Sequence, residues 1–139
     1  MKRQEWTLPP ELAAFVDSFS RLALELPGRM AAVCFEIGEI EARLRELTAQ
    51  GLIRAIPDWR TSKRKRGEHL TLVFPADAAG KRPRKYIGRD PVKVQEALDA
   101  LARAEEYDRL MEKLCSLMAG SVAASCHLSN ANHSLTCRG

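Results

Sequence analysis

Apolar residues near the start of the chain recur at three- and four-residue spacing, the period of an amphipathic α-helix. The first run begins after Pro9 and Pro10 and reaches a Pro27-Gly28 pair, which predicts its end. A second run predicts another helix from about residue 30 to 50, with Gly51 as its stop. The two runs consist of Leu12, Phe15, Val16, Phe19, Leu22 and Leu26, and then of Val33, Ile37, Ile40, Leu44 and Leu47.

After Gly51 the apolar period shortens to two, which is typical of β-strands. The pattern predicts a short strand over 52–56, a clear strand over 69–74 and a third over 85–87, after a loop that contains Gly80. Leu70, Leu72 and Phe74 share one face of the central strand, and we expect this face to meet the helices. We expect the stretch 59–67, WRTSKRKRG, to be a basic loop.

Asp90 and Pro91 are typical of an N-cap and a first helical position, and they predict a long helix to about Met118. Its apolar stripe packs either on the first two helices or on a second copy of the chain. The fold class is therefore α+β and mostly α, with two N-terminal helices, a small antiparallel sheet of two or three strands and a long C-terminal helix. We expect a single domain over 1–139, made of a helical arm (11–50), a basic β-hairpin region (51–89), the long helix (90–118) and a polar tail (119–139).

The charge of the chain is concentrated in its centre. Residues 54–93 hold 12 lysines and arginines against 4 acidic residues, a net +8, whereas the rest holds 10 against 14, a net −4. This asymmetry indicates a nucleic acid or an acidic protein as partner. The plainer alternative is a solvated strand face. Trp59 and Tyr86 lie among the basic residues, where they either stack on single-stranded bases or cover the rim of the sheet.

Several classes of protein are disfavoured by what the sequence lacks. No run approaches the roughly 20 apolar residues of a membrane span, and the polar start is unlike a secretory signal. We therefore expect a cytoplasmic protein with reduced thiols, in which Cys34 and Cys115 are buried. No nucleophile, phosphate-loop or metalloprotease motif is present, so we expect no enzyme and no cofactor.

The tail carries four zinc-compatible side chains without a close Cys-x-x-Cys pair. Our expectation is that they are scattered and bind no metal. They are Cys126, His127, His133 and Cys137.

Three stretches between Gly67 and Leu114 carry a family resemblance: HLTLVFP, GKRPRKYIGRDPVKVQEAL and ARAEEYDRL. They resemble small prokaryotic proteins associated with mobile elements, which share a Gly-Lys loop, a Tyr-Ile-Gly strand end and a following helix. The same order is similar, more weakly, to the arm-type DNA-binding domain of tyrosine recombinase integrases. That resemblance implies a basic sheet face placed against DNA, and it brings no catalytic residue onto this chain.

The expected function is that of a non-enzymatic nucleic-acid-binding accessory protein of a mobile or phage-like element, with DNA favoured over RNA. The alternative is a helical interaction module that dimerises and captures an acidic protein through its basic face. Phosphate contacts would position the protein without reading sequence. The candidate binding residues are Arg60, Lys63, Arg64, Lys65, Arg66, Lys81, Arg82, Arg84, Lys85 and Arg89.

Overall fold

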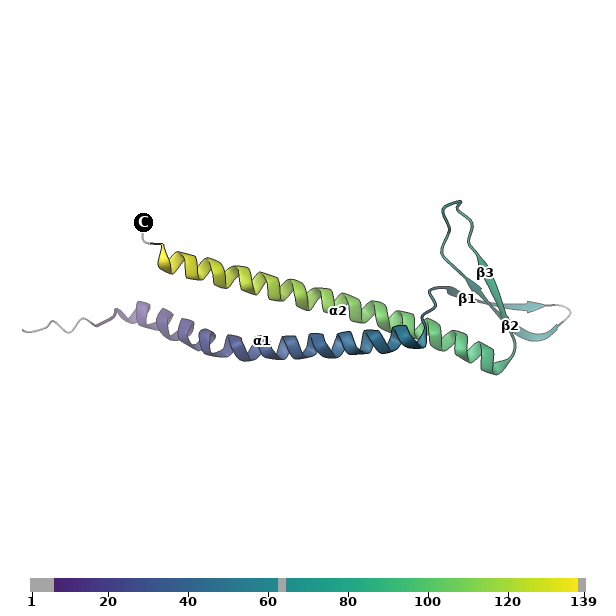
Figure 1. Ribbon diagram of the computed structural model, residues 1–139, viewed down its shortest axis with the longest axis horizontal. Coiled ribbons are helices and arrows are strands. Elements are labelled where there is room, and N and C mark those ends of the chain that lie inside the picture. Colours follow the sequence, from purple (N-terminus) through teal and green to yellow (C-terminus); the bar gives the residue numbers. More distant parts are fainter. Residues whose placement is uncertain (1–6, 63–64, 138–139) are drawn as a thin grey trace, which may run out of the picture. The chain divides into compact units, whose positions relative to one another are not determined.

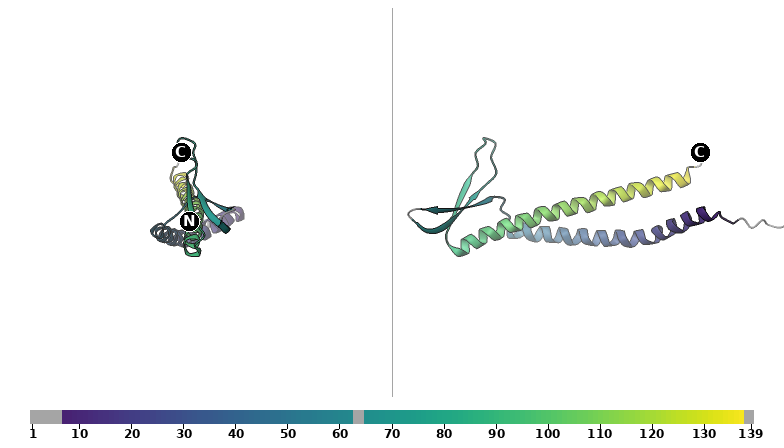
Figure 2. Two further views of the ribbon diagram at one scale, coloured as in Figure 1. Left: turned by 90° about the vertical axis from the view of Figure 1, so that its right-hand side faces the viewer. Right: turned by 180° about the vertical axis from the view of Figure 1, so that it is seen from behind.

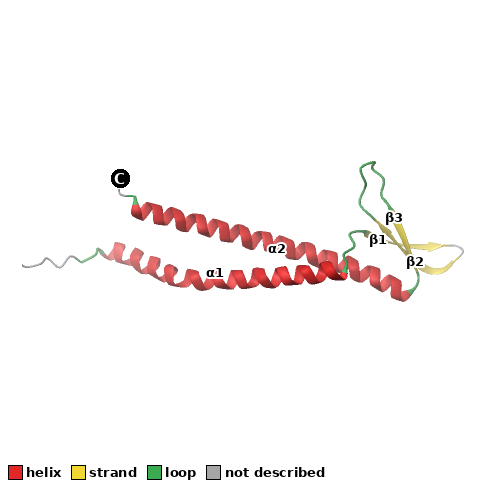
Figure 3. Cartoon of the chain, in the orientation of Figure 1, coloured by secondary structure: helices red, strands yellow, loops and turns green. Residues whose placement is uncertain are grey.

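The computed structural model describes residues 7–62 and 65–137, without the side chains of residues 62, 65 and 66. Two helices and three strands follow one another as α1 (Pro10–Gln50), β1 (Ile56–Ser62), β2 (Lys65–Val73), β3 (Arg84–Gly88) and α2 (Pro91–Thr136) (Figures 1 and 3). The chain divides into a sheet unit, residues 40–119, and a helical unit formed by the residues before 40 and after 119.

The N-terminal part is one helix, so the prediction of two helices separated at Pro27-Gly28 was wrong. α1 continues through Pro27, although proline removes a backbone donor and crowds the preceding turn. The apolar spacing also crosses this position without a shift, from Leu26 to Met30 and Val33. A continuous apolar face on both sides explains why one proline does not end the helix. Gly51 ends it as predicted, with a φ of 97°.

The three strands form an antiparallel meander in the order β1-β2-β3 (Figure 2). The third predicted strand is present as β3. The strand predicted over 52–56 is not formed, because residues 52–55 are irregular and β1 begins only at Ile56. The stretch expected to be a basic loop instead supplies the second half of β1 and the first residues of β2, with Thr61 opposite Glu68 and a register shift at Ser62. Strand formation there follows backbone pairing, which a run of polar side chains does not reveal.

One face of this sheet is covered by the start of α2. Leu70, Leu72 and Ala97 form its buried centre. Partly buried side chains from the sheet, the loops and the helix surround them: Ile53, Ala55, Phe74, Ile87, Val94, Leu98 and Leu101. The prediction that the Leu70 face meets helical structure is confirmed, and α2 supplies the covering residues.

Polar contacts also hold the end of α1 against α2 within the sheet unit. Arg103 Nε donates to the carbonyl of Gly51 at 2.8 Å, which satisfies an acceptor at the end of α1. Arg43 makes a two-pronged ion pair with Glu106, at 2.8 and 3.0 Å. The hydrogen bond from Arg43 lowers the pKa of Glu106 below its ordinary value, and the same bond raises the pKa of Arg43. These contacts hold the end of α1 on α2 at the point where the chain leads toward β1.

α2 begins as predicted, because the backbone N–H of Val92 donates to Asp90 Oδ1 at 3.1 Å. It does not stop near Met118 but continues to Thr136, through the stretch expected to be a tail. Cys34 and Cys115 are exposed, so the expectation that they are buried was wrong. Neither helix, over its described residues, has a segment apolar enough to cross a membrane.

Candidate nucleic-acid interface

The face of the sheet that points away from α2 is built by strand register. Directly opposed residues of an antiparallel pair point to the same side, and alternate residues of one strand point to opposite sides. Because Leu70 and Leu72 face α2, His69, Thr71 and Val73 face outward. Their neighbours on β1 and β3 complete what we call the outward face: Ile56, Asp58, Arg60, Arg84 and Tyr86.

The candidate cations on the strands separate between the two faces. Arg60 and Arg84 lie on the outward face, opposite His69 and Val73 respectively. Lys85 is opposite the buried Leu72 and therefore points to the other side, although it is exposed at the edge of the sheet. Arg89 is exposed in the short link to α2. The sequence grouped these residues as one patch, whereas the register assigns adjacent Arg84 and Lys85 to opposite faces.

Four further candidates come from the β1–β2 hairpin. Lys63 and Arg64 lie outside the described residues. Lys65 and Arg66 belong to β2, but their side chains lie outside the described part as well. The structure therefore describes the backbone of Lys65 and Arg66 and leaves these four cationic groups as a sequence-based prediction.

Lys81 and Arg82 lie on the loop between β2 and β3, which extends beyond the strand ends (Figure 1). The loop is held closed at its base by the N–H of Phe74, which donates to Pro83 at 2.8 Å. At its tip Asp77 Oδ1 accepts the N–H groups of Ala79 and Lys81, at 3.0 and 2.9 Å. Such local bonds define the loop conformation, so its two cations are presented on an ordered turn.

Most of the acidic residues in this basic region already have local hydrogen-bonding roles. Asp58 accepts from Arg60 Nε at 2.8 Å, Asp77 closes the β2–β3 loop, and Asp90 caps α2. Among the described residues Arg84 takes part in none of the ion pairs, which leaves its guanidinium available to an added anion. The ion pair with Asp58 offsets the charge of Arg60, so Arg84 is the candidate cation of the outward face that no described acidic side chain pairs.

An aromatic pair lies beside these cations. The rings of His69 and Tyr86 are 5.4 Å apart between centroids, and the Tyr86 side chain is 53% exposed. Tyr86 is therefore on the outward face and outside the core, while Trp59 is on the α2 side of the sheet, opposite Leu70. The sequence pattern named both rings but could not separate them, because the separation depends on the strand register.

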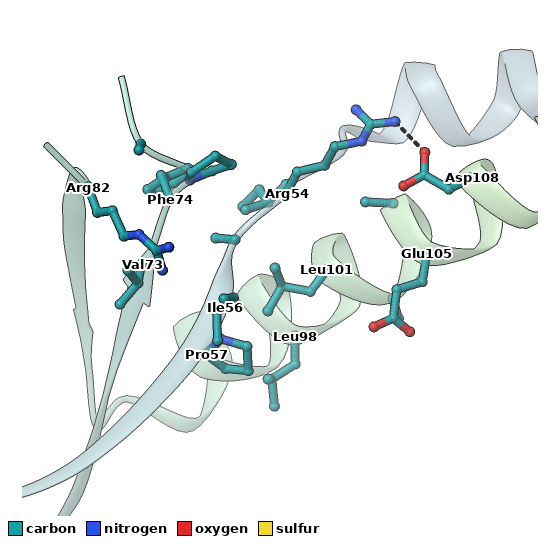
Figure 4. Close-up of a pocket in the computed structure, with 16 residues that line it drawn as sticks. Arg54, Ile56, Pro57, Val73, Phe74, Arg82, Leu98, Leu101, Glu105 and Asp108 are labelled. Atoms are coloured by element: carbon teal, nitrogen blue, oxygen red, sulfur yellow. Dashed lines mark hydrogen bonds and ion pairs between the residues drawn. The ribbon is translucent and has the colours of Figure 1, made fainter. Parts of the chain in front are cut away.

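A second feature of the sheet unit is an open groove of about 680 Å³ between α2 and the end of the sheet where β1 begins and β2 ends (Figure 4). Leu98, Leu101, Ile53 and Pro57 contribute to its apolar surface. At one edge Arg54 bonds Asp108 at 2.8 Å, which lowers the pKa of that carboxyl and raises the pKa of the guanidinium. The charged groups among its described lining residues are Arg54, Arg82, Glu105 and Asp108.

The cysteines and histidines expected in the tail lie on α2 or directly after it. Cys137 Sγ is 3.3 Å from His133 Nδ1, one helical turn apart. Over the described ranges no three His, Cys, Asp or Glu side chains come together as a metal site would require.

Comparison with known proteins gives no similar protein: no family model, curated protein or solved structure matches the chain. The candidate interface therefore depends on the geometry of the chain itself.

Proposed function

We propose that this chain is a nucleic-acid-binding accessory protein that contacts the phosphate backbone through the outward face of its sheet. DNA is the favoured ligand, and a mobile or phage-like element is the proposed setting. The observation that carries the proposal is the register that puts Arg60, Arg84 and Tyr86 on one side of a small sheet whose other side is packed on α2.

The arrangement suits a polyanion for three physical reasons. The face is built on paired strands, so its cations are held at strand spacing instead of on a free chain. The β2–β3 loop adds Lys81 and Arg82 at the end of the same sheet. The exposed Tyr86 ring beside Arg84 offers a surface on which a base can stack. Contacts of this kind supply affinity and orientation, and they carry little sequence information.

Neighbouring residues of β3 provide a matched test. Arg84→Ala and Lys85→Ala remove one positive charge each from adjacent, exposed positions on opposite faces. Binding to labelled duplex DNA, single-stranded DNA and RNA is measured by fluorescence anisotropy over a salt series. For duplex DNA, log K falls as log salt rises, and we expect Arg84→Ala to make this slope less steep by about 0.9. At 0.1 M salt this change corresponds to about tenfold weaker binding. Lys85→Ala should retain most of the affinity and slope.

Two results would count against the proposal. Equal losses in the two variants would mean that the outward face is not the binding face. No binding at low salt by protein with intact circular dichroism would reject nucleic acid as the ligand and favour an acidic protein.

A further inference from the structure

α1 carries an apolar pattern with the period of a coiled coil. From Leu12 to Leu47, eleven consecutive positions spaced alternately four and three residues apart are all apolar. This heptad seam consists of Leu12, Val16, Phe19, Ala23, Leu26, Met30, Val33, Ile37, Ile40, Leu44 and Leu47. Such 3.5-residue spacing keeps one face of a helix against another helix over many turns.

The seam is covered at one end of α1 and open at the other. Ile40, Leu44 and Leu47 are buried within the sheet unit. Toward the N-terminus the seam residues Val16 and Phe19 are 46% and 56% exposed. The same face of one helix thus changes from core to surface without any change in its sequence pattern.

The open portion is large enough to form an interface. Phe15 and Leu22 flank the seam and are exposed, which widens the apolar face beyond the two core positions of each heptad. From the exposed fractions of the large side chains between Leu12 and Met30, this face presents on the order of 600 Å² of apolar surface, or roughly 1,200 Å² for two copies. Stable interfaces begin at about that total, whereas monomers rarely expose so large an apolar patch.

The chemistry of the two helices favours α1 of another chain over α2 as the occupant. Beyond the buried Leu114, the spacing of α2 passes through the partly buried Leu117 and continues with Ser121, Ala124, Leu128, Ala131 and Leu135. Serine and alanine at three of these positions present less apolar surface to the α1 seam than its own leucine, valine and phenylalanine side chains would. The α1 seam, apolar throughout, has its best match in an identical seam.

We propose that the heptad seam of α1 packs against the same seam of a second copy of this chain, forming a homodimer through a coiled-coil contact. The interface would centre on the N-terminal half of α1, where the seam is exposed. It would be a property of the helical unit and does not depend on nucleic-acid binding by the sheet.

Two phenylalanines of α1 allow a matched test. Phe19 lies on the seam, whereas Phe35, 69% exposed, lies about 160° away around the helix axis at 3.6 residues per turn. Sedimentation velocity is run on the full chain and on Phe19→Glu and Phe35→Glu over micromolar to hundred-micromolar concentrations. We expect the unchanged chain and Phe35→Glu to sediment at twice the 15.5 kDa chain mass. Phe19→Glu should weaken association at least about a hundredfold, since it buries two charges at the contact.

Folding is checked independently by circular dichroism and by Trp59 fluorescence, which reports on the sheet. If Phe19→Glu misfolds, Met30→Glu, another exposed seam position, replaces it as the test. A 15.5 kDa species at every concentration of the unchanged chain would overturn the proposal. So would a folded Phe19→Glu that still dimerises, or equal dissociation of Phe19→Glu and Phe35→Glu.

Discussion

The small core beneath the sheet makes Leu72 a critical residue for the fold that carries the candidate interface. Leu72 is fully buried, and among the described residues Leu70 and Ala97 join it at the centre of that core. Leu72→Ala removes three carbon atoms from this centre, a transfer cost of about 2.4 kcal/mol at about 0.8 kcal/mol each. The remaining cavity adds to that cost, so we expect a loss of about 3 kcal/mol in the free energy of unfolding. For a unit of this size, such a loss is a large fraction of the total stability.

Urea unfolding followed by Trp59 fluorescence measures this loss in a chain whose other tryptophan, Trp6, is changed to Phe. Trp59 lies in β1 opposite Leu70, so its signal reports on the sheet. Leu24→Ala is the matched control because Leu24 is 83% exposed, and we expect it to change stability by no more than about 0.5 kcal/mol. A loss below about 1 kcal/mol for Leu72→Ala, or one equal to that of the control, would refute the assignment of this core.

The remaining predictions concern α1 and its ion pair with α2. Pro27→Ala should stabilise the chain by about 2 kcal/mol. The gain is about 3 kcal/mol of helix propensity, less about 1 kcal/mol because the unfolded chain becomes more flexible. Thermal unfolding followed by circular dichroism at 222 nm measures it, and a midpoint that stays the same or falls would indicate a helix broken at Pro27. Arg43 lowers the pKa of Glu106, so the ionised carboxylate of Glu106 stabilises the folded chain. This contribution is fully present above pH 4.5, the ordinary pKa of the group, and it is lost as the pH falls through the lowered pKa. The stability difference between the unchanged chain and Glu106→Gln should therefore shrink on acidification from pH 7, and urea midpoints that keep a constant difference would contradict this account.

Local signals explain the parts of the fold that were predicted correctly. Asp90-Pro91 and Gly51 act through the backbone of their own helix ends, so the start of α2 and the end of α1 follow from a few adjacent residues. The alternation of Leu70 and Leu72 with the polar His69 and Thr71 likewise identified the buried face of β2. The same local reasoning failed at Pro27, where a breaking residue lies within an apolar face that continues on both sides.

The sequence by itself determined a mostly helical chain with a small antiparallel sheet and a basic centre, since periodicity and charge are properties of neighbouring residues. Only the tertiary structure decided how that charge is distributed. Arg84 and Lys85 are adjacent and alike in sequence, yet pairing with Val73 and Leu72 places them on opposite faces. Register depends on backbone hydrogen bonds between strands distant in sequence, which no local pattern records. For the same reason the apolar face of α1 could be recognised early, but its buried and exposed portions became distinguishable only once the helices were folded.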